Sequence, residues 1–557
     1  MSKLIVIGGV AAGPKAALKA KRERPDWDVT LITNEPDITY SGCSLPYYIG
    51  GVLENRDALI VKTPDRLRDA FGIEVLTEHE VEKVDFNRRE VLVKNLKSGD
   101  LFLFSYDQLV IASGASPVLP SLLRSDAENF FTLRTIHDGA KIKSYIEANA
   151  IRKVGIIGGS FIGLELAENI ARLGISVSLI EFAPQLLPSF DTDIARVVNN
   201  IVAENAVSTF VGESAKGYRY SADRKRIVQI ETDKRVLDAD LVVVSVGVAP
   251  NTGFLKGSEA ALSPNGAIKV DPFLQTTVPG VYAAGDCAEN LNRITGEACW
   301  YPMGSTANKA GRICGENLAA LREPASFPGV LGTMILKLFG VGIGKTGLTE
   351  KDAAAAGIEY DSVIIGTEDK PKHFPGVQNS TLKLLSEKAT GRILGAQALG
   401  KGPIDKYLDT VAAALHLRGT VEDLQCLDLC YSPLFSTPIS AINLAANVLD
   451  NYRRGRYEKI SSEQLKGILQ APDTALVDVR EEDEFALEHI PGSINLSFAH
   501  LRSQHKQIPK ECSIILICES GKRAYMAYRY LKNLRYEDIK VLDGGLQAYP
   551  FRKASLF

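Results

Sequence analysis

The sequence predicts an α/β protein of several domains, and three observations support that fold class. With 557 residues the chain is too long for one hydrophobic core. Two apolar segments, 3–7 and 153–157, are each followed by a glycine turn, a helix of small residues and a second apolar segment. Near residue 458 a further alternation of helical and apolar segments begins. We therefore expect two interleaved Rossmann-like dinucleotide-binding domains, an α/β dimerisation domain and a separate C-terminal α/β domain.

The composition excludes several classes of protein. Charged residues make up 24% and the net charge is −3, which gives no reason to expect nucleic acid or an anionic membrane as a partner. No apolar run approaches the ~18 residues that a membrane span requires, and the first residues do not form a signal peptide. The eight cysteines form neither a disulfide framework nor a zinc pattern, so we expect a cytoplasmic protein without a metal site. Cys426 and Cys430 have ligand-like spacing, but we interpret them as small buried residues.

The first glycine turn follows the segment 3–7. Gly8 permits a tight turn and Gly13 permits close packing of helix on strand, so the helix N-terminus faces a pyrophosphate. Val10 replaces the middle glycine of the usual motif, which makes the motif alone weak. The predicted contacts to this dinucleotide are Gly8, Gly9, Ala11, Ala12, Gly13 and, on the adenosine ribose, Glu35.

The second turn, Gly158–Gly163, is followed by an acidic residue. Glu181 lies 18 residues after Gly163, at the end of an apolar segment. A carboxylate there accepts hydrogen bonds from a free ribose 2′-hydroxyl and repels a 2′-phosphate, which favours NADH over NADPH. The predicted contacts are Gly158, Gly159, Phe161, Ile162, Gly163 and Glu181.

The segment 278–286, with the sequence VPGVYAAGD, is more specific than either turn. It resembles the corresponding segment of the two-dinucleotide flavin reductases, the glutathione-reductase-like superfamily. The resemblance implies that Asp286 binds the ribityl hydroxyls of FAD. It also implies further cofactor contacts at Ala112, Gly114, Gly247 and Gly285, and it leaves two roles open for Glu165, a charge near the flavin or a solvated helix charge.

Cys43 lies in the segment YSGCSLPYY and has no neighbouring cysteine, whereas a dithiol reductase would carry two cysteines separated by four residues here. Gly42 and Pro46 indicate a turn at a helix start, where a thiolate is stabilised. Residues 1–447 resemble coenzyme A disulfide reductases and their persulfide- or polysulfide-reducing relatives. In that family the single thiolate attacks a disulfide or sulfane sulfur, and reduced FAD then frees it.

The same resemblance implies substrate and partner contacts. Lys15, Lys19 and Arg22 correspond to family contacts with coenzyme A phosphates, although such a helix often only presents a solvated basic face. Thr39 and Gly42 complete the predicted substrate contacts. Tyr431 corresponds to a tyrosine that reaches the active site of the partner subunit in a homodimer. A family tyrosine pair before Pro-Gly is absent, and the loss of those hydroxyls puts coenzyme A disulfide in doubt as the preferred substrate. His373 stands nearby, either as a replacement proton donor or in a packing or surface role.

The C-terminal hundred residues carry a second candidate thiol. Four motifs follow one another here: LVDVR, EHIPGSIN, Cys518-x-x-Gly521-x-Arg523 and LDGG. Their order resembles that of the rhodanese sulfurtransferases over about residues 458–552. A loop from strand to helix turns backbone N–H groups toward the Cys518 sulfur, so a persulfide anion is stabilised, and Arg523 closes the loop. Glu519 adds a negative charge, which should disfavour thiosulfate as a donor. The alternative is an inactive rhodanese used only for binding.

These motifs predict four domains and one linker: an FAD-binding domain at 1–115 and 255–325, an NAD(H)-binding domain at 116–254, a dimerisation domain at 326–447, a linker at 448–457 and a rhodanese domain at 458–557. We expect NADH to reduce FAD and FAD to reduce sulfur held on Cys43, while Cys518 handles sulfane sulfur. The expected substrates are persulfides, polysulfides and coenzyme A derivatives. One alternative is an NADH oxidase or peroxidase with a Cys43 sulfenate, and sulfide release versus peroxide consumption distinguishes it from the expected reductase. The other alternative is a redox-sensing interaction protein.

Overall fold

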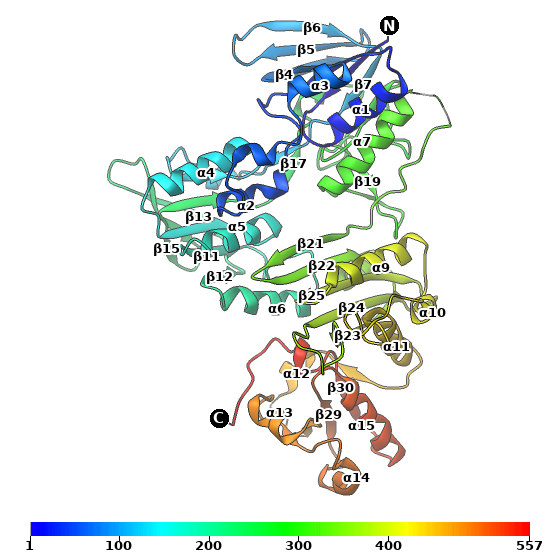
Figure 1. Ribbon diagram of the computed structural model, residues 1–557. Coiled ribbons are helices and arrows are strands. Elements are labelled where there is room, and N and C mark those ends of the chain that lie inside the picture. The colour runs from blue at the N-terminus through cyan, green and yellow to red at the C-terminus, as the bar shows by residue number, and fades with distance from the viewer. Residues whose placement is uncertain (1, 320, 322, 470, 472, 557) are drawn as a thin grey trace. The chain divides into compact units, whose positions relative to one another are not determined.

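The computed structural model describes residues 2–319, 321, 323–469, 471 and 473–556 (Figure 1). The chain divides into two compact units, the first formed by Met1–Phe182 and Ala206–Val330 and the second by Ala183–Asn205 and Leu331–Phe557. In the described residues no helix combines the length and apolar character needed to cross a bilayer.

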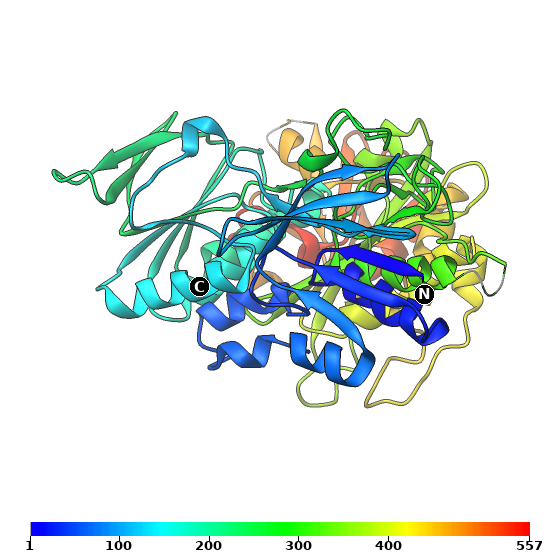
Figure 2. The same cartoon turned by 90° about the horizontal axis from the view of Figure 1, so that it is seen from above.

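The first unit begins with a parallel five-stranded sheet of order β18-β7-β1-β2-β3. Helices α1 (Ala12–Glu23) and α7 (Gly304–Ala319) lie side by side against it, and both views show these N-terminal blue and later green segments together (Figure 1, Figure 2). Small residues make this possible, because a Cβ added at Gly311 would lie 2.3 Å from the Ala12 carbonyl oxygen. The strands are β1 (Lys3–Ile7), β2 (Asp28–Ile32), β3 (Ile73–Leu76), β7 (Gln108–Ile111) and β18 (Val281–Ala283). A three-stranded antiparallel sheet, β4 (His79–Asp85), β5 (Glu90–Asn95) and β6 (Leu101–Ser105), and helix α3 (Pro64–Phe71) accompany it.

A second parallel five-stranded sheet, of order β12-β11-β10-β16-β9, is inserted between β7 and β18 in the sequence. Its strands are β9 (Phe130–Thr132), β10 (Lys153–Ile157), β11 (Ser176–Glu181), β12 (Val207–Val211) and β16 (Leu241–Val244). The antiparallel pair β8 (Ala115–Pro117) and β17 (Val248–Pro250) marks the two crossings between the sheets. The interleaving that the two glycine turns predict is thus confirmed. Further elements are α2 (Leu45–Ile49), α4 (Ile136–Ala148), α5 (Phe161–Ala171), β13 (Ala215–Tyr220), β14 (Ile227–Thr232), β15 (Val236–Asp238), β19 (Asn290–Leu291) and β20 (Ala298–Cys299).

The second unit contains an antiparallel five-stranded sheet of order β21-β22-β25-β24-β23, whose edge strand is β23 (Tyr360–Glu368). Helix α9 (Ile404–His416) packs on β22 and β25, whereas α11 (Ala441–Arg453) packs on β23 and β24. The remaining elements are α6 (Thr192–Ala203), β21 (Met334–Leu338), β22 (Val341–Gly347), α8 (Glu350–Ala355), β24 (Asn379–Glu387), β25 (Ile393–Gly400) and α10 (Val421–Cys426).

The same unit ends in a parallel five-stranded sheet of order β26-β30-β29-β27-β28. Its strands are β26 (Lys459–Ile460), β27 (Thr474–Asp478), β28 (Ile494–Asn495), β29 (Ser513–Ile517) and β30 (Ile539–Leu542). The helices are α12 (Ser462–Ile468), α13 (Glu482–Leu487), α14 (Leu501–Gln504) and α15 (Lys522–Asn533). The α/β alternation expected after residue 458 is therefore present.

The stretch 448–457 differs from the predicted linker. Helix α11 continues to Arg453, and both Leu449 and Asp450 are buried. Charge and a glycine indicated a loop, but the apolar positions of Ala441–Leu449 place a continuous face of the helix in the core. The helix ends just before Gly455, which has a φ of +63°.

Candidate active site and dinucleotide sites

The two predicted glycine turns have the same construction. Gly8 has a φ of +113°, and a Cβ on it would lie 2.0 Å from the Ala112 carbonyl oxygen. Gly158 has a φ of +117°, and its Cβ would lie 2.1 Å from the Ser245 carbonyl oxygen. Only glycine tolerates such positions, and each turn leads directly into the N-terminus of a helix, α1 or α5. This cradle fits a dinucleotide pyrophosphate at both turns.

The remaining glycines of the two turns bring helix and strand together. A Cβ on Gly13 would lie 2.0 Å from the Gly8 carbonyl oxygen, and a Cβ on Gly163 would lie 1.9 Å from that of Gly158. Gly9 packs against Thr33 and Ile38, where a Cβ would approach within 2.9 Å of Ile38. Ala11 and Ala12 stand at the start of α1, as Phe161 and Ile162 do in α5.

The two acidic residues predicted for the riboses have different surroundings. The Glu181 carboxylate accepts a hydrogen bond from the Gly159 backbone N–H at 2.6 Å, which places it beside the second turn. The Glu35 carboxylate accepts a hydrogen bond from the Tyr40 hydroxyl at 2.7 Å. Burial raises the pKa of Glu35, while the hydrogen bond from Tyr40 lowers it. The role of Glu35 on a ribose stays a prediction.

Asp286, the predicted flavin contact, is paired with an arginine that the sequence motifs did not identify. The Arg134 Nη2 atom lies 2.7 Å from the Asp286 Oδ2 atom. Gly285, with a φ of +87°, approaches the Ala12 methyl group, and Arg134 lies near Gly114, so these residues share one region of the first unit. Gly247, with a φ of +115°, precedes the crossing strand β17.

Cys43 is exposed on a short 3-10 turn, Gly42–Ser44, that leads into α2. Desolvation raises the pKa of its thiol, the Glu165 charge raises it further, and Arg134 lowers it. The helix start was expected to stabilise the thiolate, but α2 spans only Leu45–Ile49 and the carboxylate acts in the opposite direction. Together these effects favour the thiol form of Cys43 over the thiolate.

Glu165 lies beside this thiol, not on a solvated helix face. It projects from α5 and accepts a hydrogen bond from the Tyr47 hydroxyl. Desolvation raises the pKa of Glu165 to about 7, with the Tyr47 hydrogen bond opposing the shift. Near neutral pH this carboxyl group exchanges a proton, which is the behaviour of an acid or base matched to its working pH.

A basic cavity of about 310 Å³ is lined by Lys15, Lys19 and Arg22, with Leu18, Lys62, Phe71 and Arg312 as the other lining residues. Lys19 is ion paired with Glu23 and Glu316. Thr39, whose φ is +48°, exchanges hydrogen bonds with the backbone of Lys62, at 2.6 and 2.8 Å. Lys62 and Arg312 were missed in the sequence because each comes from a different part of the chain.

The Cys518 loop has the predicted arrangement of N–H donors. The Cys518 sulfur accepts hydrogen bonds from the backbone N–H groups of Gly521 and Ala524, at 3.2 and 3.4 Å. Gly521, with a φ of +90°, turns the chain into α15. Desolvation raises the pKa of the Cys518 thiol, whose exposure is 1%, while the N–H groups lower it.

The charges around this loop are paired. Arg523 makes two hydrogen bonds to the Glu484 carboxylate, one of them 2.7 Å long, and this pairing lowers the pKa of Glu484. The Arg480 Nη1 atom lies 3.5 Å from the Glu519 Oε2 atom, and Arg480 is buried against Asp478. Arg480 partly offsets the negative charge of Glu519, an effect that sequence reasoning did not anticipate.

The comparison with known sequence families decides the identity of these domains. Residues 2–307 match the pyridine nucleotide-disulphide oxidoreductase family, residues 335–441 match its dimerisation domain, and residues 461–550 match the rhodanese-like domain. The chain belongs to the pyridine nucleotide-disulphide oxidoreductase family. The family implies FAD and NAD(P)H, and the two glycine turns of this oxidoreductase fit both groups.

Individual relatives give more detail. A curated relative from Methanocaldococcus jannaschii, named NADH oxidase, is 32% identical over 448 residues, which is 80% of this chain and 98% of the relative. The NAD(P)H coenzyme A polysulfide/persulfide reductase of Pyrococcus horikoshii is 32% identical over 455 residues, 80% of this chain and 98% of that protein. The structure of an NAD-dependent persulfide reductase from A. fulgidus has a TM-score of 0.93 and 32% identity, and the match covers 99% of this chain and 100% of that one.

The dimerisation domain of this oxidoreductase carries the remaining predicted residues on its surface. Tyr431 is 53% exposed, and His373 is exposed with its ring 4.7 Å from that of Phe374. Cys426 and Cys430 are exposed, so their interpretation as buried residues was wrong. The inner face of α10 is formed by Val421 and Leu424, which leaves the end of that helix at the surface.

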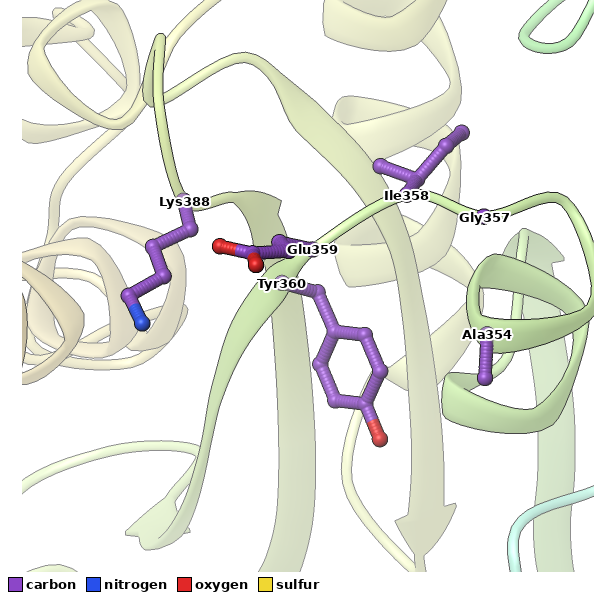
Figure 3. A pocket seen from close by; sticks show the side chains of 6 residues that line it. All are labelled: Ala354, Gly357, Ile358, Glu359, Tyr360 and Lys388. Carbon is purple, nitrogen blue, oxygen red and sulfur yellow. The ribbon is translucent and has the colours of Figure 1, made fainter.

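A second cavity, of about 370 Å³, lies in the same domain and is lined by Ala354, Gly357, Ile358, Glu359, Tyr360 and Lys388. Figure 3 shows the Glu359 carboxylate on the side of Lys388, while the Tyr360 ring points elsewhere. None of the predicted site residues lines this cavity. Its lining offers no thiol, and we assign the chemistry to the cysteine loops.

Proposed function

We propose that this oxidoreductase reduces persulfides, polysulfides or coenzyme A disulfides with NADH and FAD through Cys43, and that its rhodanese domain handles sulfane sulfur on Cys518. The observation that carries the proposal is the solitary state of Cys43. Every cysteine in the described part of the chain is a free thiol, so Cys43 has no disulfide partner within it. The second sulfur of the reaction must then come from the substrate.

The chemistry of Cys43 balances without a second protein thiol. The thiolate attacks the sulfane sulfur of a persulfide, the S–S bond of the substrate breaks, and a thiol leaves. FAD held at the first glycine turn would supply two electrons, received from NADH held at the second turn. Two-electron cleavage of the new S–S bond on Cys43 gives the Cys43 thiolate and hydrosulfide. Glu165 takes up the proton of the Cys43 thiol, since its pKa of about 7 matches neutral pH.

The basic cavity supports a phosphate-bearing substrate. Arg22 and Arg312 present guanidinium groups and Lys15 and Lys62 present ammonium groups around one hollow, which is the donor set that phosphates of coenzyme A require. The polysulfide/persulfide reductase of P. horikoshii carries coenzyme A in its name, which agrees with this assignment. Glu181 beside the second turn favours NADH over NADPH.

The proposal includes a homodimer in the cytoplasm. The match to a dimerisation domain supports the dimer, in which Tyr431 would reach the active site of the other subunit. Sedimentation of the holoenzyme measures the oligomeric state, and Tyr431→Phe should lower sulfide release without affecting reduction of the flavin by NADH.

The deciding experiment compares sulfur substrates under anaerobic conditions. NADH oxidation and sulfide release are measured with coenzyme A persulfide, coenzyme A disulfide, glutathione persulfide and inorganic polysulfide. Wild type should release sulfide in proportion to the NADH oxidised with a persulfide. Cys43→Ser should abolish release while NADH still bleaches the flavin, and Cys299→Ser serves as the matched control. Release that survives in Cys43→Ser would refute the role of Cys43.

A second candidate function is an NADH oxidase or peroxidase with Cys43 cycling as a sulfenate. The similarity to the M. jannaschii protein of that name favours it. It predicts consumption of oxygen or peroxide at rates that exceed persulfide turnover. The fused rhodanese domain favours sulfur chemistry, because a peroxide-reducing cycle has no use for a sulfane carrier.

A further inference from the structure

The edge strand of the dimerisation sheet is covered by the rhodanese domain. Strand β23 pairs with β24 on one side, and on its other side the buried Ile364 N–H donates to the Asp543 Oδ1 atom at 3.0 Å. Lys459 donates to the other oxygen of Asp543 at 2.6 Å. Open edge strands invite pairing with other chains, and this carboxylate binds one N–H group of the edge instead. The two domains are therefore docked through defined polar contacts.

Glycines on both sides allow a close approach at this contact. A Cβ on Gly366 of β23 would lie 2.4 Å from the Gln547 Oε1 atom and 3.1 Å from the Ser520 Cβ atom. Gly544 has a φ of +72°, and its Cβ would lie 2.7 Å from the Ile364 Cγ2 atom. Ser520 belongs to the loop that surrounds the Cys518 sulfur. The backbone of the dimerisation sheet thus touches the rhodanese loop itself.

Gln547 connects the sheet to that loop. Its side-chain amide donates to the Ser380 carbonyl oxygen of β24 at 2.7 Å. Its backbone N–H donates to the Glu519 carbonyl oxygen at 3.1 Å, and the neighbouring Leu546 N–H donates to the Cys518 carbonyl oxygen at 2.9 Å. A displacement of Gln547 would therefore be transmitted to the two residues whose backbone sets the direction of the loop.

We propose that Gln547 is a positioning residue for Cys518, anchored on the dimerisation domain, and that Gly366 is required for that anchor. The inference rests on the proposed role of Cys518 and adds that its reactivity depends on a different domain. The loop N–H groups stabilise negative charge on sulfur only while they point at it. Without the anchor the loop relaxes and the Cys518 thiolate and persulfide anion become less stable.

Two variants of the full-length holoenzyme test this relationship. Gln547→Met keeps the side-chain length but removes the donor to Ser380. Gly366→Ala changes only the dimerisation domain, so any effect on Cys518 must pass through the contact. The matched controls are Gln378→Met, whose amide donates to the Gly376 carbonyl oxygen, and Gly217→Ala, where a Cβ meets open space.

The readout is the rate of Cys518 alkylation by iodoacetamide as a function of pH, followed by mass spectrometry of the Cys518 peptide. We expect both test variants to raise the pH midpoint by about half a unit, a loss of about threefold in thiolate at neutral pH. Flavin reduction by NADH should match wild type. A midpoint that stays with wild type in either test variant, or that moves equally in the controls, overturns the proposal. Alkylation requires no sulfur donor, so this result does not depend on whether wild-type Cys518 accepts sulfur from coenzyme A persulfide. If wild-type Cys518 accepted no sulfur, that result would count against the proposed function alone.

Discussion

Arg134 and Asp286 form an ion pair, with 2.7 Å between the Nη2 and Oδ2 atoms, although 152 positions separate them in the sequence. The pair links the segment before α4 to the end of β18, where the flavin contact is predicted. Arg134 also lowers the pKa of the Cys43 thiol. One guanidinium therefore influences both the proposed flavin ligand and the proposed redox thiol.

Replacing Arg134 should weaken both the binding of FAD and the stability of the Cys43 thiolate. In Arg134→Met we expect about tenfold weaker retention of FAD, because Asp286 loses the partner that orients it, which corresponds to ~1.4 kcal/mol. The pH midpoint of Cys43 alkylation should rise, because a cation that favours the thiolate is removed. Flavin fluorescence after gel filtration and peptide-resolved alkylation measure the two effects. Arg124→Met, on an exposed loop, is the control. Unchanged FAD retention in Arg134→Met would contradict the proposal that Arg134 orients Asp286 for binding the flavin.

Glu165 should control the pH dependence of Cys43. Ionised Glu165 raises the pKa of the thiol, so the neutral amide in Glu165→Gln should lower it. Above pH 7, where the wild-type carboxyl group is ionised, Cys43 alkylation in Glu165→Gln should be about threefold faster. Below pH 6 the carboxyl group is protonated in wild type and the rates should converge.

Turnover gives an independent test of the same carboxyl group. If Glu165 accepts the thiol proton, sulfide release in Glu165→Gln should fall even though Cys43 is more reactive. The matched substitution Glu168→Gln, one turn further along α5, should change turnover less. Faster alkylation together with faster turnover would show that Glu165 perturbs the thiol without serving as its base.

The basic cavity predicts different effects for residues on the same helix. Arg22→Gln should raise the KM for coenzyme A persulfide about fivefold, whereas Lys19→Gln should change it less, because Lys19 is already ion paired with Glu23 and Glu316. Glutathione persulfide has no phosphate and serves as the control substrate, with KM unchanged in both variants. High salt should reduce the difference between the substrates. Equal increases in KM for both substrates would exclude a phosphate site in this cavity.

The sequence predicted those parts of the molecule that depend on short segments. The glycine turns at Gly8 and Gly158 and the loop at Cys518 are specified within about six residues, because their backbone angles and N–H directions are local properties. Arg134, Lys62 and Gln547 contribute through contacts between distant segments, and no local pattern marks them. The end of α11 shows a related limit: Arg453 and Arg454 indicated a linker, but the buried helix face that includes Leu449 keeps the chain helical as far as Arg453.

Glu519 provides a test of charge compensation in the rhodanese loop. Its carboxylate should repel the dianion thiosulfate, but Arg480 lies 3.5 Å away and offsets part of that charge. We therefore expect Glu519→Gln to raise kcat/KM for thiosulfate only about two- to threefold, with Glu482→Gln on exposed α13 as the matched control. Steady-state formation of thiocyanate from thiosulfate and cyanide measures the change. Rates that match wild type would remove Glu519 as a determinant of donor choice, whereas an increase well above tenfold would show that Arg480, held by Asp478, does not compensate the carboxylate.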